Sequence, residues 1–192
     1  MQTEIFSDKE GGESVSSVFK KCFVCWNIQG LESSMDDINI FLDELYGKGI
    51  IIHVLLFCET FLTDNNKNNI KLDGYNNTNY IRPEHGGGIS IYVQEDIDFK
   101  VSNNNIQNLF RKPNECLFIE ILQNNKKPIL IGEIYRKPNE NPSIYTEDLD
   151  KLLKICNSNY SDVYIGTDQN IDLIKNNSMK DMLIDVLYGN QF

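Results

Sequence analysis

Short apolar runs separated by polar segments recur along this chain. Such runs are typical of buried β-strands. They predict strands over residues 22–28, 50–57, 89–93, 115–122, 128–135 and 160–167. The polar residues 123–127 between two of these runs predict a β-hairpin.

A helical spacing of apolar residues appears twice. The first stripe is formed by Ile38, Phe41, Leu42 and Leu45. Ser34 precedes it and Gly47 follows it, as expected of the residues that begin and end a helix. A second stripe is formed by Leu149, Leu152, Leu153 and Cys156. A last helix is predicted from Ser178 to Leu187.

Strands joined both by hairpins and by helices predict an α/β fold with mixed sheets. The Asn-rich residues 64–79 predict a surface loop, and residues 1–20, which lack any apolar period, predict a disordered leader. We therefore expect one domain over residues 21–192.

The charge and composition narrow the class of protein. With a net charge of −10 and a pI near 4.7, a broad basic surface for nucleic acid is not expected. Contact with phosphate through a bound divalent cation remains compatible with this charge. No apolar run approaches the roughly 20 residues that span a bilayer, and residues 1–20 lack the apolar core of a signal peptide. We expect an intracellular protein, nuclear or cytoplasmic, with no membrane partner.

Polar side chains repeatedly follow the predicted strands. They are Asn27, Glu59, Tyr135, Asp168 and Asn170. Ligands of layered α/β proteins gather at such strand ends. A carboxylate there can orient water, and a carboxamide can donate to a phosphate oxygen. The structural alternative is that Asp and Asn simply bond their own backbone in a turn.

The glycines 86–88 also have two interpretations, a phosphate cradle or a bend leading into a strand. No Gly-Lys-Ser/Thr follows them, so a P-loop is excluded.

Five motifs occur in a distinctive order: WNIQGL at 26–31, CETFL at 58–62, GGISIYV at 87–93, IYRKPN at 134–139 and GTDQNIDL at 166–173. This order resembles the endonuclease/exonuclease/phosphatase superfamily. Within it, residues 22–173 are most similar to the apurinic-type endonuclease domain of non-LTR (LINE-like) retrotransposons.

The resemblance implies a four-layered α/β sandwich, in which two mixed sheets are flanked by helices, and hydrolysis of phosphate esters assisted by Mg²⁺ or Mn²⁺. It places Asn27 and Glu59 at the metal. It implies that Asp168 orients or deprotonates the attacking water and that Asn170 holds the scissile phosphate. It also implies that Tyr135 donates a hydrogen bond near this phosphate. Arg136 and Lys137 have two open interpretations, contact with the DNA backbone or solvation.

The sequence departs from the family pattern in two places. Thr167 is an extra residue in the usual Gly-Asp-x-Asn run. The family also has a further Asp and a Ser-Asp-His run well downstream of Asn170, whereas no Asp-His pair occurs in this sequence. We therefore expect a truncated domain that lacks its last strands and is weakly active or inactive.

The predicted function is that of a retrotransposon DNA endonuclease domain, which holds the DNA phosphate backbone weakly and precedes a reverse transcriptase in a full-length element. Two alternatives stay open. One is a phosphatase or phosphodiesterase of the same superfamily, and the other is a non-catalytic remnant that folds or binds without turnover.

Overall fold

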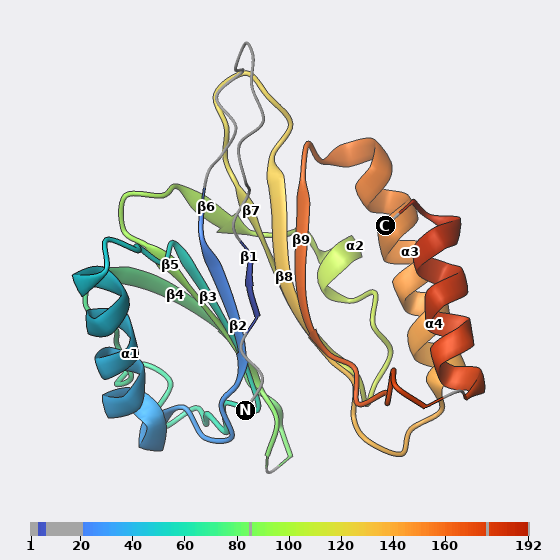
Figure 1. The fold of residues 1–192 in the computed structure, drawn as a ribbon, viewed down its shortest axis with the longest axis horizontal. Helices are drawn as coiled ribbons and strands as arrows, with labels where there is room; N and C mark the ends of the chain where they lie inside the picture. The colour runs from blue at the N-terminus through green and yellow to red at the C-terminus, as the bar shows by residue number, and fades with distance from the viewer. Residues whose placement is uncertain (1–3, 7–20, 85, 176, 192) are drawn as a thin grey trace. The chain divides into compact units, whose positions relative to one another are not determined.

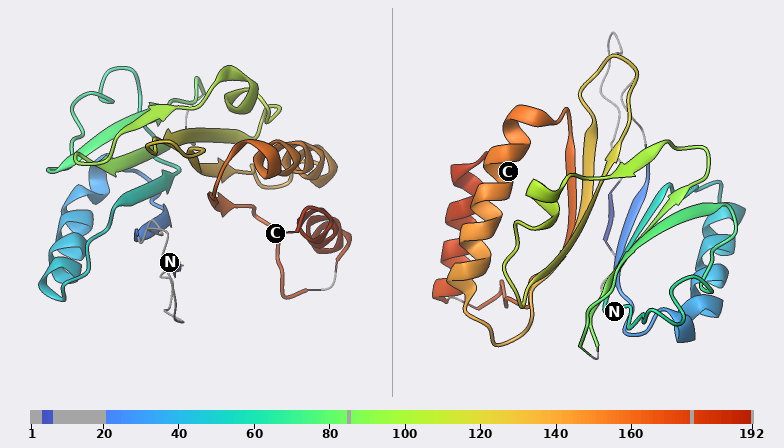
Figure 2. Two further views of the ribbon diagram at one scale, coloured as in Figure 1. Left: turned by 90° about the horizontal axis from the view of Figure 1, so that it is seen from above. Right: turned by 180° about the vertical axis from the view of Figure 1, so that it is seen from behind.

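The computed structural model of this chain describes residues 4–6, 21–84, 86–175 and 177–191. The chain divides into two compact units, Met1–Ile97 and Asp98–Phe192, so the domain expected over residues 21–192 contains two units. Each unit holds one mixed β-sheet with helices packed on it, as Figures 1 and 2 show. The predicted α/β class with two mixed sheets and flanking helices is confirmed.

The first unit is built on a five-stranded sheet with the order β1-β2-β3-β5-β4. Its strands are β1 (Glu4–Phe6), β2 (Phe23–Asn27), β3 (Val54–Cys58), β4 (Tyr75–Tyr80) and β5 (Ile89–Gln94). The pair β2–β3 is parallel and every other pair is antiparallel. A short 3₁₀ turn, η1 (Glu32–Ser34), leads into helix α1 (Met35–Gly47), which connects the two parallel strands.

Helix α1 forms where the apolar stripe predicted it. Ile38 and Leu45 are buried against the sheet, and Phe41 packs edge-on to Trp26 with ring centroids 5.7 Å apart. Ser34 precedes the helix without a side-chain capping bond, since its hydroxyl donates to the carbonyl of Gly30 instead. The helix therefore takes its position mainly from its buried face rather than from a cap.

Three predictions in the first unit need correction. The strand predicted over residues 50–57 begins only at Val54, and Ile50 and Ile51 are exposed. Within the predicted loop 64–79, residues from Tyr75 onward form β4 at the edge of the sheet. Of the predicted leader, Glu4–Phe6 forms β1, while residues 1–3 and 7–20 lie outside the described residues.

The second unit is built on a four-stranded sheet with the order β6-β7-β8-β9. Its elements are β6 (Phe99–Val101), α2 (Asn104–Gln107), β7 (Glu115–Ile121), β8 (Ile129–Tyr135), α3 (Pro142–Asn159), β9 (Val163–Asp168) and α4 (Ser178–Gly189). The predicted hairpin is the antiparallel pair β7–β8, and β8–β9 is parallel. Strand β6 and helix α2 were not predicted, because they are too short to show a period.

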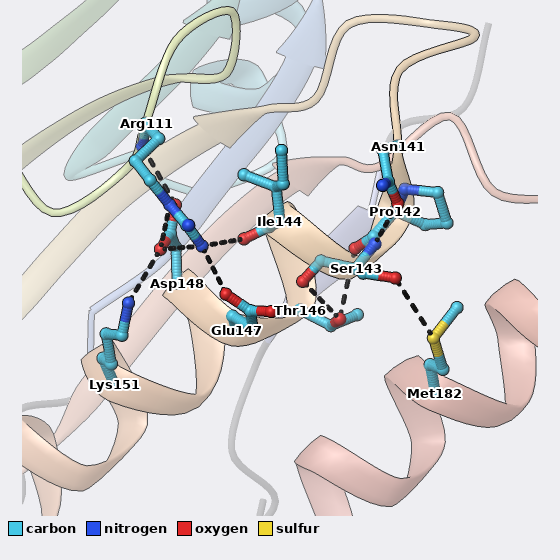
Figure 3. A network of polar contacts seen from close by, with 10 residues as sticks. All are labelled: Arg111, Asn141, Pro142, Ser143, Ile144, Thr146, Glu147, Asp148, Lys151 and Met182. Atoms are coloured by element: carbon cyan, nitrogen blue, oxygen red, sulfur yellow. Dashed lines mark hydrogen bonds and ion pairs between the residues drawn. The ribbon is translucent and has the colours of Figure 1, made fainter.

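Helix α3 covers one face of this sheet, and α4 lies beside α3 (Figure 1). The second predicted stripe is buried, with Leu149, Leu152, Leu153 and Cys156 all in the core. The first turns of α3 are also held by polar contacts, since the buried Asp148 binds Arg111 from the loop between α2 and β7 (Figure 3). None of the helices in the described part of the chain is both long and apolar enough to cross a membrane.

Candidate functional site

In the first unit, two predicted site residues meet at the carboxyl ends of the parallel strands. Asn27 is the last residue of β2 and is paired in register with Cys58, the last residue of β3. Glu59 follows directly, and the Asn27 side-chain amide donates to Glu59 Oε1 at 3.0 Å. Both side chains are partly exposed. The parallel pairing therefore brings together two residues that are 32 positions apart in the sequence.

The loops around this pair are held in an unusual backbone conformation. Gln29, Glu59 and Phe61 have φ values of 48°, 52° and 55°, in the left-handed region that few non-glycine residues adopt. The loops are joined by backbone hydrogen bonds, in which Gly30 N–H donates to the Glu59 carbonyl at 2.9 Å and Leu31 N–H to the Thr60 carbonyl at 3.0 Å. Such conformations persist where the surrounding structure over-determines them, which is common at functional sites.

The glycine segment 86–88 forms hydrogen bonds with the loop that contains Glu59. The carbonyls of Gly87 and Gly88 accept hydrogen bonds from the amides of Phe61 and Thr60 at 2.8 and 3.2 Å. At Gly88, φ is +91°, and a Cβ would lie 2.7 Å from Thr60 Oγ1. These contacts agree with the interpretation of the glycines as a bend that leads into β5.

In the second unit, the other three predicted residues lie at the end of β8–β9. Tyr135 and Asp168 are register partners at the carboxyl ends of these parallel strands. Asn170 follows in the left-handed region, with φ at 49°, and its side-chain amide donates to the Arg136 carbonyl at 2.8 Å. Asn170 is exposed, Asp168 is half-buried and Tyr135 is buried.

The sequence also allowed a purely structural role for Asp168, in which its side chain accepts a hydrogen bond from the backbone of its own turn. The structure contains such a bond. The Asn170 backbone N–H donates to Asp168 Oδ1 at 3.2 Å. A carboxylate accepts several hydrogen bonds, so this bond and a role in orienting water are compatible.

Arg136 differs from both of its sequence-based interpretations. Its side chain is 1% exposed, so it neither contacts DNA nor is solvated, whereas the neighbouring Lys137 is exposed. The guanidinium donates to the carbonyls of Gln169, Asn170 and Glu140. This burial could not be predicted from the sequence, because the carbonyls that surround Arg136 belong to segments whose position only the fold determines.

The extra Thr167 has a structural partner. Successive residues of a strand face opposite sides, and Thr167 Oγ1 shares a hydrogen bond of 3.2 Å with the Tyr145 hydroxyl of α3. Tyr145 is buried, and burial raises its pKa to about 12. The added residue thus joins β9 to α3 and leaves the Asp-x-Asn spacing intact.

A cavity of about 570 Å³ lies beside Asn170. The residues that line it include Asn139, Asn141 and Asn170 together with Pro138, Pro142 and Met179. The volume is in the range of small-molecule sites. The loop between β8 and α3 forms one wall of it.

The donor set of the first unit suits Mg²⁺. The ion prefers hard oxygen ligands and usually takes one or two carboxylates, with water and phosphate completing its shell. Glu59 offers a carboxylate, and Asn27 an amide within hydrogen-bonding distance of it. Among the described residues, no group of three or more His, Cys, Asp or Glu side chains is placed to hold a metal. A closed all-protein site is therefore absent from this part of the chain, whereas an open one remains compatible with it.

No family model matches the sequence, and a search of curated proteins finds no match either. Solved structures do match. The endonuclease domain of TRAS1, a telomere-specific non-LTR retrotransposon, aligns with 88% of this chain and 69% of its own, at 15% identity and a TM-score of 0.63. Truncated TDP2 of Caenorhabditis elegans aligns with 78% of this chain and 62% of its own, at 15% identity and a TM-score of 0.54.

The human Nocturnin catalytic domain, solved with a bound sulfate anion, aligns with 78% of this chain and 64% of its own, at 15% identity and a TM-score of 0.52. The chain thus spans less than two thirds of the TDP2 and Nocturnin structures. These structures share the endonuclease/exonuclease/phosphatase fold. The chain therefore has the fold of that superfamily, as the order of its motifs predicted.

Proposed function

We propose that this chain is a Mg²⁺-dependent phosphodiesterase that cleaves DNA strands, in the manner of a retrotransposon endonuclease domain. One observation carries the proposal: in each unit the predicted residues lie side by side at the carboxyl ends of a parallel strand pair. The fold, which is similar to that of the TRAS1 endonuclease domain, supports it.

In this proposal Asn27 and Glu59 hold the cation. A Mg²⁺ ion bound there supplies positive charge that stabilises the oxyanions of phosphoryl transfer. The hydrogen bond between the two side chains fixes the Glu59 carboxylate in one direction before metal binds. Glu59 is also in the left-handed region, with φ at 52°, in a loop whose backbone is held by hydrogen bonds to Gly30 and Leu31.

For the second unit we propose separate roles in binding phosphate and water. Asp168 orients or deprotonates the attacking water. One N–H of the Asn170 amide is bound to the Arg136 carbonyl, and its second N–H donates to a phosphate oxygen, since a carboxamide carries two donor hydrogens. Tyr135 donates a hydrogen bond near the same phosphate.

DNA is the proposed substrate because two of the similar structures act on or contain it. One is an endonuclease domain, and another is TDP2 of D. rerio in complex with a single-strand DNA product, which aligns with 88% of this chain at a TM-score of 0.53. We further propose that a full-length element carries a reverse transcriptase after this domain.

The test is nicking of supercoiled plasmid with Mg²⁺ by the parent, Glu59→Gln and Asp168→Asn. We expect each variant to lose about 10²-fold or more in rate, the scale of removing one catalytic group. Matched controls are Glu44→Gln, an exposed glutamate of α1, and Asp162→Asn, an exposed aspartate directly before β9. Both should nick at the parent rate.

The other two classes of function predict different results. The chain also resembles ANGEL2, described as a 2′,3′-cyclic phosphatase, with a TM-score of 0.50. Hydrolysis of a 2′,3′-cyclic nucleotide without plasmid nicking would favour a phosphatase. A folded parent that hydrolyses neither substrate would identify a non-catalytic remnant.

A further inference from the structure

Arg136 is the largest of the fully buried side chains in the described part of the chain, and none of the roles proposed above uses it. A buried guanidinium is costly unless its charge and its N–H groups are compensated. We propose that Arg136 is the positioning residue of the site, which holds Asp168 and Asn170 in their working orientation. This inference rests on the proposed function of those two residues.

The guanidinium binds the turn that carries both residues. Its Nε donates to the Gln169 carbonyl, and its Nη2 donates to the Asn170 carbonyl at 2.9 Å. Its Nη1 donates to the Glu140 carbonyl at 2.9 Å, on the loop that forms one wall of the cavity beside Asn170. One side chain thus joins the turn after β9 to the loop after β8.

The backbone of Arg136 binds the same turn. Its N–H donates to the Asp168 carbonyl at 2.9 Å, and its carbonyl accepts from the Asn170 side-chain amide at 2.8 Å. The carbonyls of three successive residues, 168 to 170, therefore all bind Arg136, the first through its backbone N–H and the other two through its guanidinium. The second contact also fixes the direction of the Asn170 amide.

Converging carbonyl dipoles repel one another unless a cation lies between them. The planar guanidinium supplies that charge and several donors in a fixed geometry, whereas a lysine ammonium is a single point on a flexible chain. Asn170 is also in the left-handed region, with φ at 49°, which costs free energy for a non-glycine residue. Without Arg136 the turn has a lower-energy alternative, and both site residues move with it.

The first experiment reads the turn directly, by amide hydrogen exchange and NMR of the parent, Arg136→Lys and Arg136→Met. We expect both variants to lose protection and shift resonances at residues 168–170, including the Asn170 side-chain amide. The ladder amides of Ile165 and Thr167 should stay protected. The matched control is Arg111→Met, because Arg111 also donates to a backbone carbonyl and to α3 of this unit but does not touch the turn. Unchanged signals at residues 168–170 in both Arg136 variants would overturn the inference.

The second experiment separates positioning from simple loss of stability. In plasmid nicking we expect kcat to fall by about 10²-fold in the Arg136 variants, the scale of a displaced catalytic group, with a much smaller change in KM. Arg111→Met should keep the parent kcat. Millimolar guanidinium should partly restore kcat to Arg136→Ala, since it can refill the vacated position. Equal kcat for the parent and folded Arg136 variants would contradict a positioning role.

The two experiments distinguish failure of the proposed function from failure of the positioning role of Arg136. If the folded parent does not nick DNA, the proposed function fails, while the exchange data still decide whether Arg136 holds the turn. If the parent nicks and the turn is unchanged without Arg136, the positioning role fails alone.

Discussion

Asp148 shows how one buried charge connects two segments of the second unit (Figure 3). Its carboxylate accepts from the Arg111 backbone N–H at 3.0 Å and from Arg111 Nε at 2.9 Å, and it lies 3.3 Å from Lys151 Nζ. Burial alone raises the pKa of this carboxyl, but the hydrogen bonds from Arg111 and Lys151 outweigh burial and hold the pKa below its usual value. The ionised form is thus favoured in the folded state.

We predict that Asp148→Asn lowers the free energy of unfolding by about 2 kcal/mol at pH 7, the scale of hydrogen bonds to a charged group. Because the folded pKa is lowered, the contribution of Asp148 is complete above the unfolded pKa of about 3.9 and is lost as the pH falls through the folded value. Urea unfolding at pH 7, 5 and 3 should show the difference between parent and variant shrinking only at the lowest pH.

The matched control is Glu147→Gln, which removes the other carboxylate bound to Arg111. Glu147 lies 2.8 Å from Arg111 Nη2, but its side chain is 60% exposed. Exposed ion pairs contribute little to stability. If both variants lost the same free energy of unfolding at pH 7, burial of Asp148 would not increase its contribution to stability.

The candidate site illustrates what single residues reveal before a structure is known. Asn27, Glu59 and Asp168 could be selected because each ends or follows an apolar run, and strand ends collect polar groups in this class of fold. Arg136 could not be selected, since its burial depends on carbonyls 33 and 34 positions away. Sequence position shows where a chain turns, but not which distant backbone groups surround a side chain.

At the scale of elements, one glycine of β8 leaves room for a buried aromatic ring of β7. Gly132 of β8 is the register partner of Phe118 in β7, and Phe118 is fully buried. A Cβ at Gly132 would lie 2.0 Å from Phe118 Cδ1 and 2.3 Å from its Cε1. The phenylalanine ring therefore occupies the space that a larger residue at position 132 would need.

We predict that Gly132→Ala lowers the free energy of unfolding by about 3 kcal/mol, since an overpacked core forces side chains or backbone to shift. The matched control is Gly47→Ala at the last residue of α1, where a Cβ meets nothing within 4 Å. That change should be neutral or stabilise by less than about 1 kcal/mol, because alanine favours helix over glycine. Thermal and urea unfolding measure both, and a Gly132→Ala protein as stable as the parent would refute the packing argument.

Elements with a buried face were predicted well, and those without one were missed. Helix α1, helix α3 and the β7–β8 hairpin show their periods because each buries a regular set of apolar residues. Strand β4, with the sequence YNNTNY, lies at an edge with one neighbour, and its side chains are largely half-buried or exposed. Its strand conformation comes from hydrogen bonds to β5. The pattern of apolar residues does not reveal such bonds.

At the scale of the whole molecule, negative charge is unevenly divided. Met1–Ile97 contains 15 acidic and 7 basic residues, a net charge of −8, whereas Asp98–Phe192 contains 13 and 11, a net charge of −2. Neither unit has the net positive charge that favours non-specific binding to the DNA backbone. Any affinity for DNA must then come from a bound cation and from a few local contacts, such as the exposed Lys137.

We therefore predict weak DNA binding that requires Mg²⁺. Fluorescence anisotropy with labelled duplex and Asp168→Asn, chosen so that cleavage does not interfere, should show binding with Mg²⁺ and little in EDTA. Adding Glu59→Gln should remove the response to Mg²⁺, because the proposed metal ligand is lost. At fixed Mg²⁺, the slope of log K against log salt should be shallow, since each neutralised phosphate adds about 0.9 to its magnitude. Tight binding in EDTA with a steep salt slope would instead require a basic surface, which is incompatible with this charge distribution.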